Sequence, residues 1–336
     1  MKIMVFDVAA ETVGALSVLN DFYNDFKADV ENEYIFIVSK PKLREMENIK
    51  VLRYPWIKKS WLHRLYFDNF IAPKLIQVHK VDEVLSLQNV IIPNTKVKQK
   101  VYVHNSLPFV EYRFTFTENR LLWVYQNILS KIMFYSMKKA NKVIVQTEWM
   151  KKACIEKIKI KSEKVEVMPP KINIEVKKYF KHTKESLSTF FYPASGFDFK
   201  NHKIFINTCL ELKALGIDNY RIILTLDGRE NEVISDLFEQ VKLHKLPIDF
   251  IGNISREKVY DYYSESVLIF PSYIESSPLP LTEAKMHGTP ILCSDCAFSH
   301  EILDDYEKVR FFNPFKYEEL ANEIKQIIDS NIHRVN

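Results

Sequence analysis

The chain has 336 residues, of which 47% are hydrophobic and 27% are charged. This balance is typical of a globular protein and excludes a disordered or fibrous one, and the length suits two domains of ordinary size. No apolar run reaches the roughly 18 residues of a membrane span, and the first residues enter a strand-like run instead of a signal peptide, so we expect a cytoplasmic protein.

The net charge of +4 is unevenly distributed along the chain. Residues 1–170 carry 27 Lys and Arg against 18 Asp and Glu, whereas residues 171–336 carry 20 against 25. The basic first half has neither aromatic-rich RNA motifs nor a helix-turn-helix signature. We therefore expect it to meet an anionic surface or substrate, and we expect no nucleic acid partner.

The four cysteines are too few for a disulfide framework in a chain of this size. Cys293 and Cys296 form a C-x-x-C, but there is no second pair and no histidine cluster beyond His300. We interpret the two cysteines as small apolar residues that follow a buried strand. The alternative is that they form a metal or redox site.

The chain opens as a strand followed by a helix. Lys2 to Val8 is a buried-type strand, and a helix is predicted from about Leu16 to Phe26. Gly14 lies in the turn between them, where the missing side chain permits close approach to a phosphate. An ordinary turn glycine remains the alternative.

Strands are predicted next at residues 34–38 and 50–52, and the stretch from Arg53 to Phe67 follows without an acidic residue. Its cations interleave with aromatic rings, a mixture that can lie in a lipid headgroup layer. The alternative is a core helix with its aromatic side chains inside. The residues that we expect at a membrane surface are Arg53, Trp56, Lys58, Lys59, Trp61 and Arg64.

Further strands are predicted at residues 81–87 and 100–103, and the second ends at His104. A side chain at the carboxyl end of a parallel strand points into the ligand cleft of an open α/β sheet. His104 is therefore a candidate site residue, although most single histidines are structural. One long helix from Glu118 to Lys139 and a strand from Lys142 to Gln146 follow.

Pro169 and Pro170 begin a lysine-rich, weakly patterned segment that continues to Thr189 and reads as a linker between domains. The alternation of strands and helices then starts again, with strands at residues 189–193, 221–226, 248–251 and 267–270 and a last helix at residues 317–328. This pattern predicts a second doubly wound sheet. Lys200 lies in its first strand-to-helix loop, either as a solvated charge or as a phosphate ligand.

The stretch from Val267 to Ile291 is the most informative in the chain. A short strand ends at Pro271, Glu275 follows in a loop, and Ser276, Ser277 and Pro278 have the composition of a helix N-terminus. The helix carries Glu283 and ends at Gly288. Such a helix start presents free N–H groups and a positive dipole end, which suits a ligand with phosphates and hydroxyls.

Within this stretch, PS-x-x-E, P-L-P-L, EA and H-G-T-P-I together resemble the donor-binding segment of glycosyltransferase family four. Members of that family are retaining nucleotide-sugar transferases with the GT-B fold, in which two Rossmann-like doubly wound domains face each other across a cleft. The resemblance covers nearly the whole chain and is most specific from Phe250 to Leu303. It also extends to Thr147, where the family has Ser or Thr.

The resemblance implies roles for individual residues. Glu275 would face the donor sugar, Glu283 would hold the ribose hydroxyls, Lys200 would bind the donor phosphates and His104 would contact the donor sugar or the acceptor. The catalytic candidates are Glu275, Lys200 and His104, and the donor-binding candidates are Gly14, Ser195, Ser277, Pro278, Leu279 and Glu283.

The sequence departs from the family pattern in three places. Ser276, Ser277 and Pro278 replace glycines after the first Glu, Val13-Gly14 replaces a Gly-Gly pair, and Ser195 stands where an arginine is common. Arg229 and Arg256 are the candidates to substitute for that arginine.

These observations predict an acceptor-side domain at residues 1–170 and a donor domain at residues 171–336, with the last helix, residues 317–330, packing back on the first domain. We expect a retaining hexosyltransferase that moves sugar from a nucleotide-diphosphate sugar to a glycan or polyprenyl-linked acceptor in surface polysaccharide or capsule assembly at the inner face of the plasma membrane. No D-x-D motif ends a strand, so neither a metal nor another cofactor is expected. The alternatives are a nucleotide-sugar epimerase of the same fold and a non-catalytic sugar-binding subunit.

Overall fold

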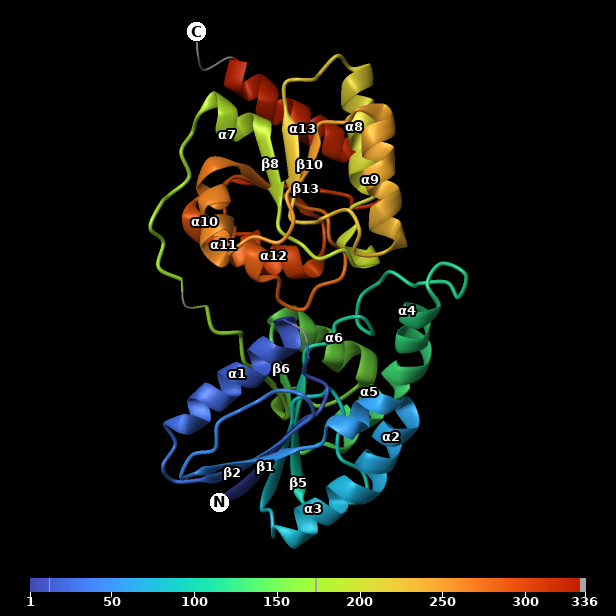
Figure 1. The fold of residues 1–336 in the computed structure, drawn as a ribbon, viewed down its shortest axis with the longest axis vertical. Helices are drawn as coiled ribbons and strands as arrows, with labels where there is room; N and C mark the ends of the chain where they lie inside the picture. The colour runs from blue at the N-terminus through green and yellow to red at the C-terminus, as the bar shows by residue number, and fades with distance from the viewer. Residues whose placement is uncertain (12, 173, 333–336) are drawn as a thin grey trace. The chain divides into compact units, whose positions relative to one another are not determined.

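A computed structural model of the chain describes residues 1–11, 13–172 and 174–332. The chain divides into two compact units, Met1–Lys171 and Ile172–Asn336, and each is built around its own parallel β-sheet (Figure 1). The predicted class, α/β with two doubly wound domains, is confirmed. In the described ranges, no helix combines the length and the apolar character needed to cross a membrane.

The first unit forms a seven-stranded sheet in the order β3-β2-β1-β4-β5-β6-β7, with helices in the crossovers. Its elements are β1 (Lys2–Asp7), α1 (Val13–Lys27), β2 (Glu33–Val38), β3 (Ile49–Arg53), η1 (Pro55–Lys59), α2 (Trp61–Tyr66), η2 (Phe67–Ile71), α3 (Ala72–Val78), β4 (Glu83–Ser86), β5 (Lys98–Val103), α4 (Arg120–Val124), η3 (Tyr125–Leu129), α5 (Ser130–Lys139), β6 (Lys142–Val145), α6 (Glu148–Ile158), η4 (Ser162–Lys164) and β7 (Val165–Val167).

Alternate strand residues of this sheet point to opposite faces, so the core has two sides. Val5 and Tyr102 pack with residues of α1 on one side. Met4 and Phe6 pack with η2 and α3 on the other side, where Val101 packs with α5. Hence α1 covers one face of the sheet, while α2, η2, α3 and α5 cover the opposite face (Figure 1).

Two long helices of this unit contain a π-helical turn. The segment predicted as one helix is continuous from Arg120 to Lys139, with η3 as its π turn. The segment from Trp61 to Val78 is likewise continuous, with η2 as its π turn. A π turn holds one more residue than an α turn, so side chains after it are rotated around the helix relative to those before it.

The second unit forms a six-stranded parallel sheet in the order β10-β9-β8-β11-β12-β13. Its elements are α7 (Lys184–Ser188), β8 (Thr189–Tyr192), η5 (Asp198–Lys200), α8 (Ile204–Ala214), β9 (Arg221–Leu224), α9 (Glu232–His244), β10 (Ile248–Phe250), α10 (Arg256–Glu265), β11 (Val267–Phe270), α11 (Leu279–His287), β12 (Ile291–Ser294), α12 (Ala297–Leu303), β13 (Val309–Phe312) and α13 (Tyr317–Ile332).

The segment expected to be a linker contains a short helix that the sequence pattern did not predict. Helix α7 is held at its start by a capping box, in which Thr183 and Ser186 each bond the other's backbone N–H. Before it, Phe180 and Lys181 donate backbone hydrogen bonds to His287 and Ser264 of the second unit. The last helix, α13, packs on α8, α7 and β13 of its own unit.

One acidic side chain is buried at the edge of the first core. Asp7, the last residue of β1, is 1% exposed. Its Oδ1 accepts a hydrogen bond of 3.1 Å from the backbone N–H of Ala10, and its Oδ2 has no hydrogen-bond partner among the described residues. Burial raises the pKa of this carboxyl from 3.8 to about 7, against the weaker opposing effect of its backbone hydrogen bonds and of Arg64 and Lys58.

This pKa shift predicts that the protein loses stability as the pH rises. The folded protein keeps the Asp7 proton up to about pH 7, whereas the unfolded chain releases it near 3.8. Ionisation therefore favours unfolding across that window. Asp7→Asn cannot ionise, and we expect it to be more stable than the wild type by a few kcal/mol, on the order of 2 to 4, at about pH 8, with a much smaller difference at about pH 5.

Denaturant unfolding of both proteins at the two pH values measures this difference. The exposed Asp218, changed to Asn in the same way, serves as the control and should leave the pH dependence as it is. Equal pH dependence in Asp7→Asn and the wild type would show that Asp7 is not a buried acid.

Candidate functional site

The predicted donor residues of the second unit gather where the sheet changes direction. Strands β8 and β11 are neighbours, but the chain leaves β8 toward β9 and leaves β11 toward β12. The two loops therefore diverge at the carboxyl edge, where ligands of such sheets usually bind. Lys200 lies in the loop after β8 and Glu275 in the loop after β11.

The structure brings these two side chains into direct contact. Lys200 Nζ lies 2.5 Å from Glu275 Oε1, and the side chains are only 17% and 14% exposed. The hydroxyl of Ser272 donates a hydrogen bond of 2.6 Å to the same carboxylate oxygen. Lys200 and Glu275 thus form a largely desolvated ion pair, and Ser272 helps to hold the carboxylate in position. Both residues lie in loops where ligands of this fold class bind.

Helix α11 begins beside Glu275, at Leu279. Its N-cap residue is Pro278, which makes no side-chain capping hydrogen bond. Ser277 precedes it in the same loop. The side chain of Pro278 therefore does not cap the positive end of the helix dipole. A helix start that binds an anion needs an N-cap of this kind.

Glu283 lies inside α11 and is 6% exposed. Its Oε1 accepts a hydrogen bond of 2.6 Å from Arg256 Nη2, and its Oε2 accepts one of 3.1 Å from the Tyr263 hydroxyl. Burial, and next the Glu283 charge, raise the pKa of Tyr263 well above its ordinary value. A carboxylate has about four lone-pair positions, so Glu283 keeps acceptor capacity beyond these two bonds.

The position of the missing family arginine is occupied by an exposed Ser195 in the loop after β8. Of its two suggested substitutes, Arg256 is engaged with Glu283 and with the hydroxyl of Tyr260. Arg229 is exposed in the loop after β9, the strand next to β8. The sequence suggested Arg256 only as a substitute cation and did not predict its pairing with Glu283.

The sheet of the first unit has the same change of direction, between β1 and β4, and sequence reasoning missed the residues there. Asp7 ends β1, and Gln88 follows β4 and accepts a hydrogen bond of 3.4 Å from the Val8 N–H. Both side chains are buried, and Asp7 Oδ2 and Gln88 Nε2 have no partners in the described part of the chain. The available signal was the acidic residue at the end of an otherwise apolar strand.

The other predicted residues of the first unit lie near this edge. His104 follows β5, the neighbour of β4, and its backbone N–H donates a hydrogen bond of 2.9 Å to Asn89 Oδ1. Burial lowers the pKa of His104 to about 4, so its ring is neutral at pH 7. Gly14 is exposed in the first turn of α1, and a Cβ there would meet no atom within 4 Å. The space beside Gly14 is therefore open, and its contact with a phosphate stays a prediction.

The cations expected at a membrane surface are mostly engaged with the protein. The Arg53 guanidinium donates to the Lys40 carbonyl, Lys58 contacts Glu11 and the Ala9 carbonyl, and Arg64 pairs with Asp68 at 2.5 Å. The Trp56 ring is half-buried and packs 6.0 Å from the Phe67 ring. Of the six predicted residues, Lys59 and Trp61 are exposed and make none of these contacts.

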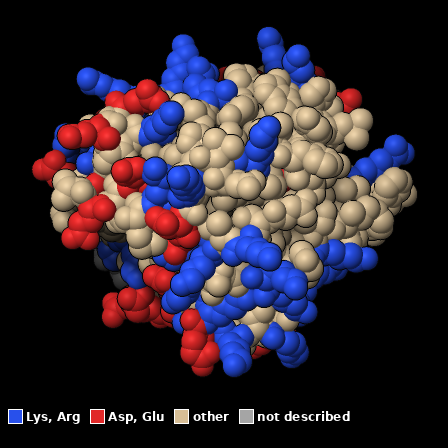
Figure 2. Space-filling model, turned by 90° about the horizontal axis from the view of Figure 1, so that it is seen from below, with Lys and Arg blue, Asp and Glu red and all other residues tan. Residues whose placement is uncertain are grey.

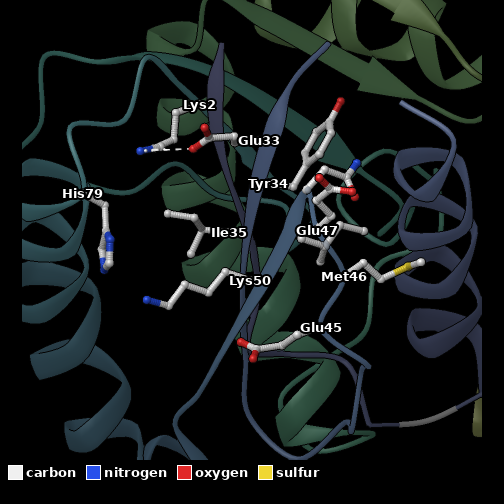
Figure 3. A pocket seen from close by; sticks show the side chains of 11 residues that line it. Lys2, Glu33, Tyr34, Ile35, Glu45, Met46, Glu47, Lys50 and His79 are labelled. Carbon is white, nitrogen blue, oxygen red and sulfur yellow. Dashed lines mark ion pairs between the residues drawn. The ribbon is translucent and has the colours of Figure 1, made fainter. Parts of the chain in front are cut away.

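A separate hollow of about 350 Å³ lies at the opposite, amino edge of the first sheet (Figure 3). Lys2 and Glu33 form an ion pair of 3.2 Å in it, and Lys50, Glu45 and His79 also line it. Because ligands of open α/β sheets bind at the carboxyl edge, this hollow is not part of the candidate site.

The C-x-x-C pair shows no metal-site geometry. Cys293 is buried and its thiol donates to Ser299 Oγ at 3.2 Å, while burial raises its pKa above the ordinary range. Cys296 is the N-cap residue of α12. Within residues 1–11, 13–172 and 174–332, no three His, Cys, Asp or Glu side chains come together as a metal ligand set.

Comparisons with known proteins agree with this architecture. The solved structures that resemble the chain include a sucrose-phosphate synthase from Thermosynechococcus elongatus, with a TM-score of 0.70 and 14% identity over 98% of this chain and 90% of that one. Anabaena Alr3699/HepE in complex with UDP and glucose has a TM-score of 0.64 and 16% identity over 98% and 90%. These likenesses show that the fold is GT-B, as predicted.

A curated relative is the O-antigen chain mannosyltransferase RfbU of Salmonella typhimurium, which is 27% identical over 231 residues. The match covers 68% of this chain and 60% of the relative, less than two thirds of its length. Residues 175–336 match the family described as glycosyl transferases group 1. The matched residues include the candidate donor site, and the match confirms the predicted resemblance to glycosyltransferase family four.

Proposed function

We propose that this protein transfers a hexose-type sugar from a nucleotide-diphosphate sugar to a glycan or lipid-linked acceptor, with retention of configuration, in the assembly of a surface polysaccharide at the inner face of the plasma membrane. The observation that carries the proposal is the fixed Lys200–Glu275 pair at the direction change of the second sheet, inside the part of the chain that matches the family. RfbU, a mannosyltransferase of O-antigen chains, supports the polysaccharide class of product.

The chemistry follows from where charge develops. When the bond between the sugar and the diphosphate breaks, the leaving diphosphate gains negative charge and the sugar becomes cation-like. Lys200 and the start of α11 offer positive charge that is already oriented toward the phosphates, so little reorganisation is needed. Glu275 holds the lysine in place and provides a carboxylate near the positively charged sugar. We expect this arrangement to act without a metal ion.

The first test removes the charges of this pair one at a time. Lys200→Met and Glu275→Gln each keep the approximate shape and should each lower turnover at least tenfold, about 1.4 kcal/mol of barrier. Each single change should also lower the free energy of unfolding by about 1–3 kcal/mol, because it leaves one buried charge unpaired. The assay follows release of nucleoside diphosphate from a panel of nucleotide sugars, with lipid-linked saccharides as acceptors.

The double variant Lys200→Met/Glu275→Gln separates function from stability. It leaves no charge unpaired, so it should recover much of the lost stability and none of the lost turnover. Full turnover in either single variant would overturn the site assignment. Sugar transfer that fails with every donor in the panel, together with intact nucleotide binding, would favour a non-catalytic sugar-binding subunit. Interconversion of the free nucleotide sugars would indicate an epimerase.

A second test concerns the proposed ribose contact of Glu283. Glu283→Gln keeps the shape but weakens the acceptor, and we expect the KM for the donor to rise about tenfold with a smaller change in kcat, because ribose binding is the same in the ground state and the transition state. Steady-state kinetics with the active donor measure this. Glu307→Gln, an exposed position, is the control and should change neither constant. An unchanged KM in Glu283→Gln would show that Glu283 does not bind the ribose and serves only in its hydrogen bonds with Arg256 and Tyr263.

A further inference from the structure

The outer face of the helix from Trp61 to Val78 is unusually apolar. Trp61 is 61% exposed, Leu62 77% and Phe70 65%, and Leu65 and Tyr66 are also more than half exposed. Their positions recur four residues apart, so they share one face of the helix. The Tyr66 and Phe70 rings lie 5.5 Å apart on that face.

The helix from Arg120 to Lys139 has a second apolar outer face. Leu121 is 60% exposed, Ile128 50%, Ile132 49% and Tyr135 58%. The sequence analysis predicted this helix but attached no surface role to it, because periodicity alone cannot distinguish its inner from its outer apolar side chains.

Both helices are also apolar on the inner face that packs against the sheet. Phe67 and Ile76 are buried against Met4 and Phe6, and Met133 is buried in the cluster that covers β5 and β6. Each helix thus carries apolar side chains on its outer face as well as on its inner face, beyond what packing on the sheet requires. Exposed apolar side chains that gather in this way often mark a binding surface in soluble proteins.

The two outer faces belong to one side of the first unit. The helix from Trp61 to Val78 covers β1 and β2, the helix from Arg120 to Lys139 covers β5 and β6, and both lie on the face opposite α1. Strand β4 joins these parts of the sheet, since it pairs with β1 and with β5. We call the nine exposed residues the two-helix surface: Trp61, Leu62, Leu65, Tyr66, Phe70, Leu121, Ile128, Ile132 and Tyr135.

The charges on the two helices are almost all positive. Between Arg53 and Lys80 the sequence has one acidic residue, Asp68, which is paired with Arg64, and between Arg120 and Thr147 it has none. The exposed cations on and beside these helices are Lys59, Lys74, Arg120, Lys131, Lys138 and Lys139. On the right of Figure 2, the side on which α2 and α5 lie in Figure 1, a broad uncharged area is bordered by Lys and Arg, while Asp and Glu gather on the left.

We propose that the two-helix surface docks the protein onto an anionic phospholipid bilayer, with Leu62, Phe70, Ile128 and Ile132 entering the acyl boundary and the surrounding lysines on the lipid phosphates. Trp61, Tyr66 and Tyr135 have the amphipathic rings that settle at such a boundary. Each cation near an anionic bilayer adds about 1 kcal/mol of attraction. A second copy of the chain would bring like charges together at the same surface, which disfavours it as the occupant.

This proposal deepens the proposed function, because a lipid-linked acceptor would be met at the docked surface, and it changes which residues make the contact. The sequence located the contact in the cations of the stretch from Arg53 to Phe67, most of which the folded protein uses internally. The structure adds a second helix and assigns the binding energy chiefly to exposed apolar side chains.

Vesicle flotation tests the proposal with vesicles of phosphatidylglycerol and phosphatidylethanolamine, and with phosphatidylcholine vesicles for comparison. The wild type should bind the anionic vesicles more tightly than the neutral ones. Leu62→Glu/Phe70→Glu on one helix and Ile128→Glu/Ile132→Glu on the other should each lower the partition coefficient at least tenfold. Val30→Glu and Leu243→Glu place the same charge at positions that are 93% and 72% exposed elsewhere, and should leave binding unchanged.

Unfolding measurements on each variant verify that the fold is intact, which is expected because all the substituted side chains are exposed. Undiminished binding in Ile128→Glu/Ile132→Glu would overturn the role of the second helix. A wild type that does not bind anionic vesicles, and that forms a dimer which the same substitutions break, would assign the surface to a second copy and overturn the proposal. Donor turnover on a water-soluble acceptor, measured on the same variants, should be unaffected, so that failure of docking and failure of sugar transfer are distinguishable.

Discussion

In a parallel sheet, the carboxyl ends of all strands lie at one edge. Where the strand order changes direction, the loops after two neighbouring strands run apart, and the candidate sites of both units lie at this point. In the second unit the point lies between β8 and β11, and Lys200 and Glu275 meet there although 75 residues separate them in the sequence. In the first unit it lies between β1 and β4, where Asp7 and Gln88 are buried.

Ionisable groups at or near these points are buried at a considerable desolvation cost. Glu283 is offset by Arg256 and Tyr263, and Lys200 by Glu275, so their charges are held in place by partners. Asp7 has only a backbone hydrogen bond on one oxygen, and burial keeps it protonated to about pH 7. Groups with such unfavourable surroundings are concentrated at functional sites, because a core built for stability alone would use apolar residues there.

Two helices on one face of the first unit likewise place side chains in unfavourable surroundings, in this case apolar side chains at the surface. Their inner faces are part of the core, and their outer faces remain apolar between positive charges. The π turns η2 and η3 lie within these two helices and rotate the residues that follow them. A donor site in one unit and a lipid-facing surface in the other would give the two halves the different partners that their opposite net charges suggested.

The sequence by itself determined most of the strands, the α/β class and the family resemblance of the segment from Val267 to Ile291, because apolar runs, proline stops and helix-start residues are local signals that tertiary packing did not override. It made Lys200, Glu275 and Glu283 candidate site residues through the pattern around them. It could not determine that Arg256 pairs with Glu283, that Arg53, Lys58 and Arg64 have partners within the protein, or that α7 forms before β8. Those outcomes depend on which distant side chains are brought together, and only the packed structure decides that. For the same reason the burial of Asp7 and the exposure of Ile128 and Ile132 could not be read from local pattern, since an apolar helix position looks alike whether it faces the sheet or the solvent.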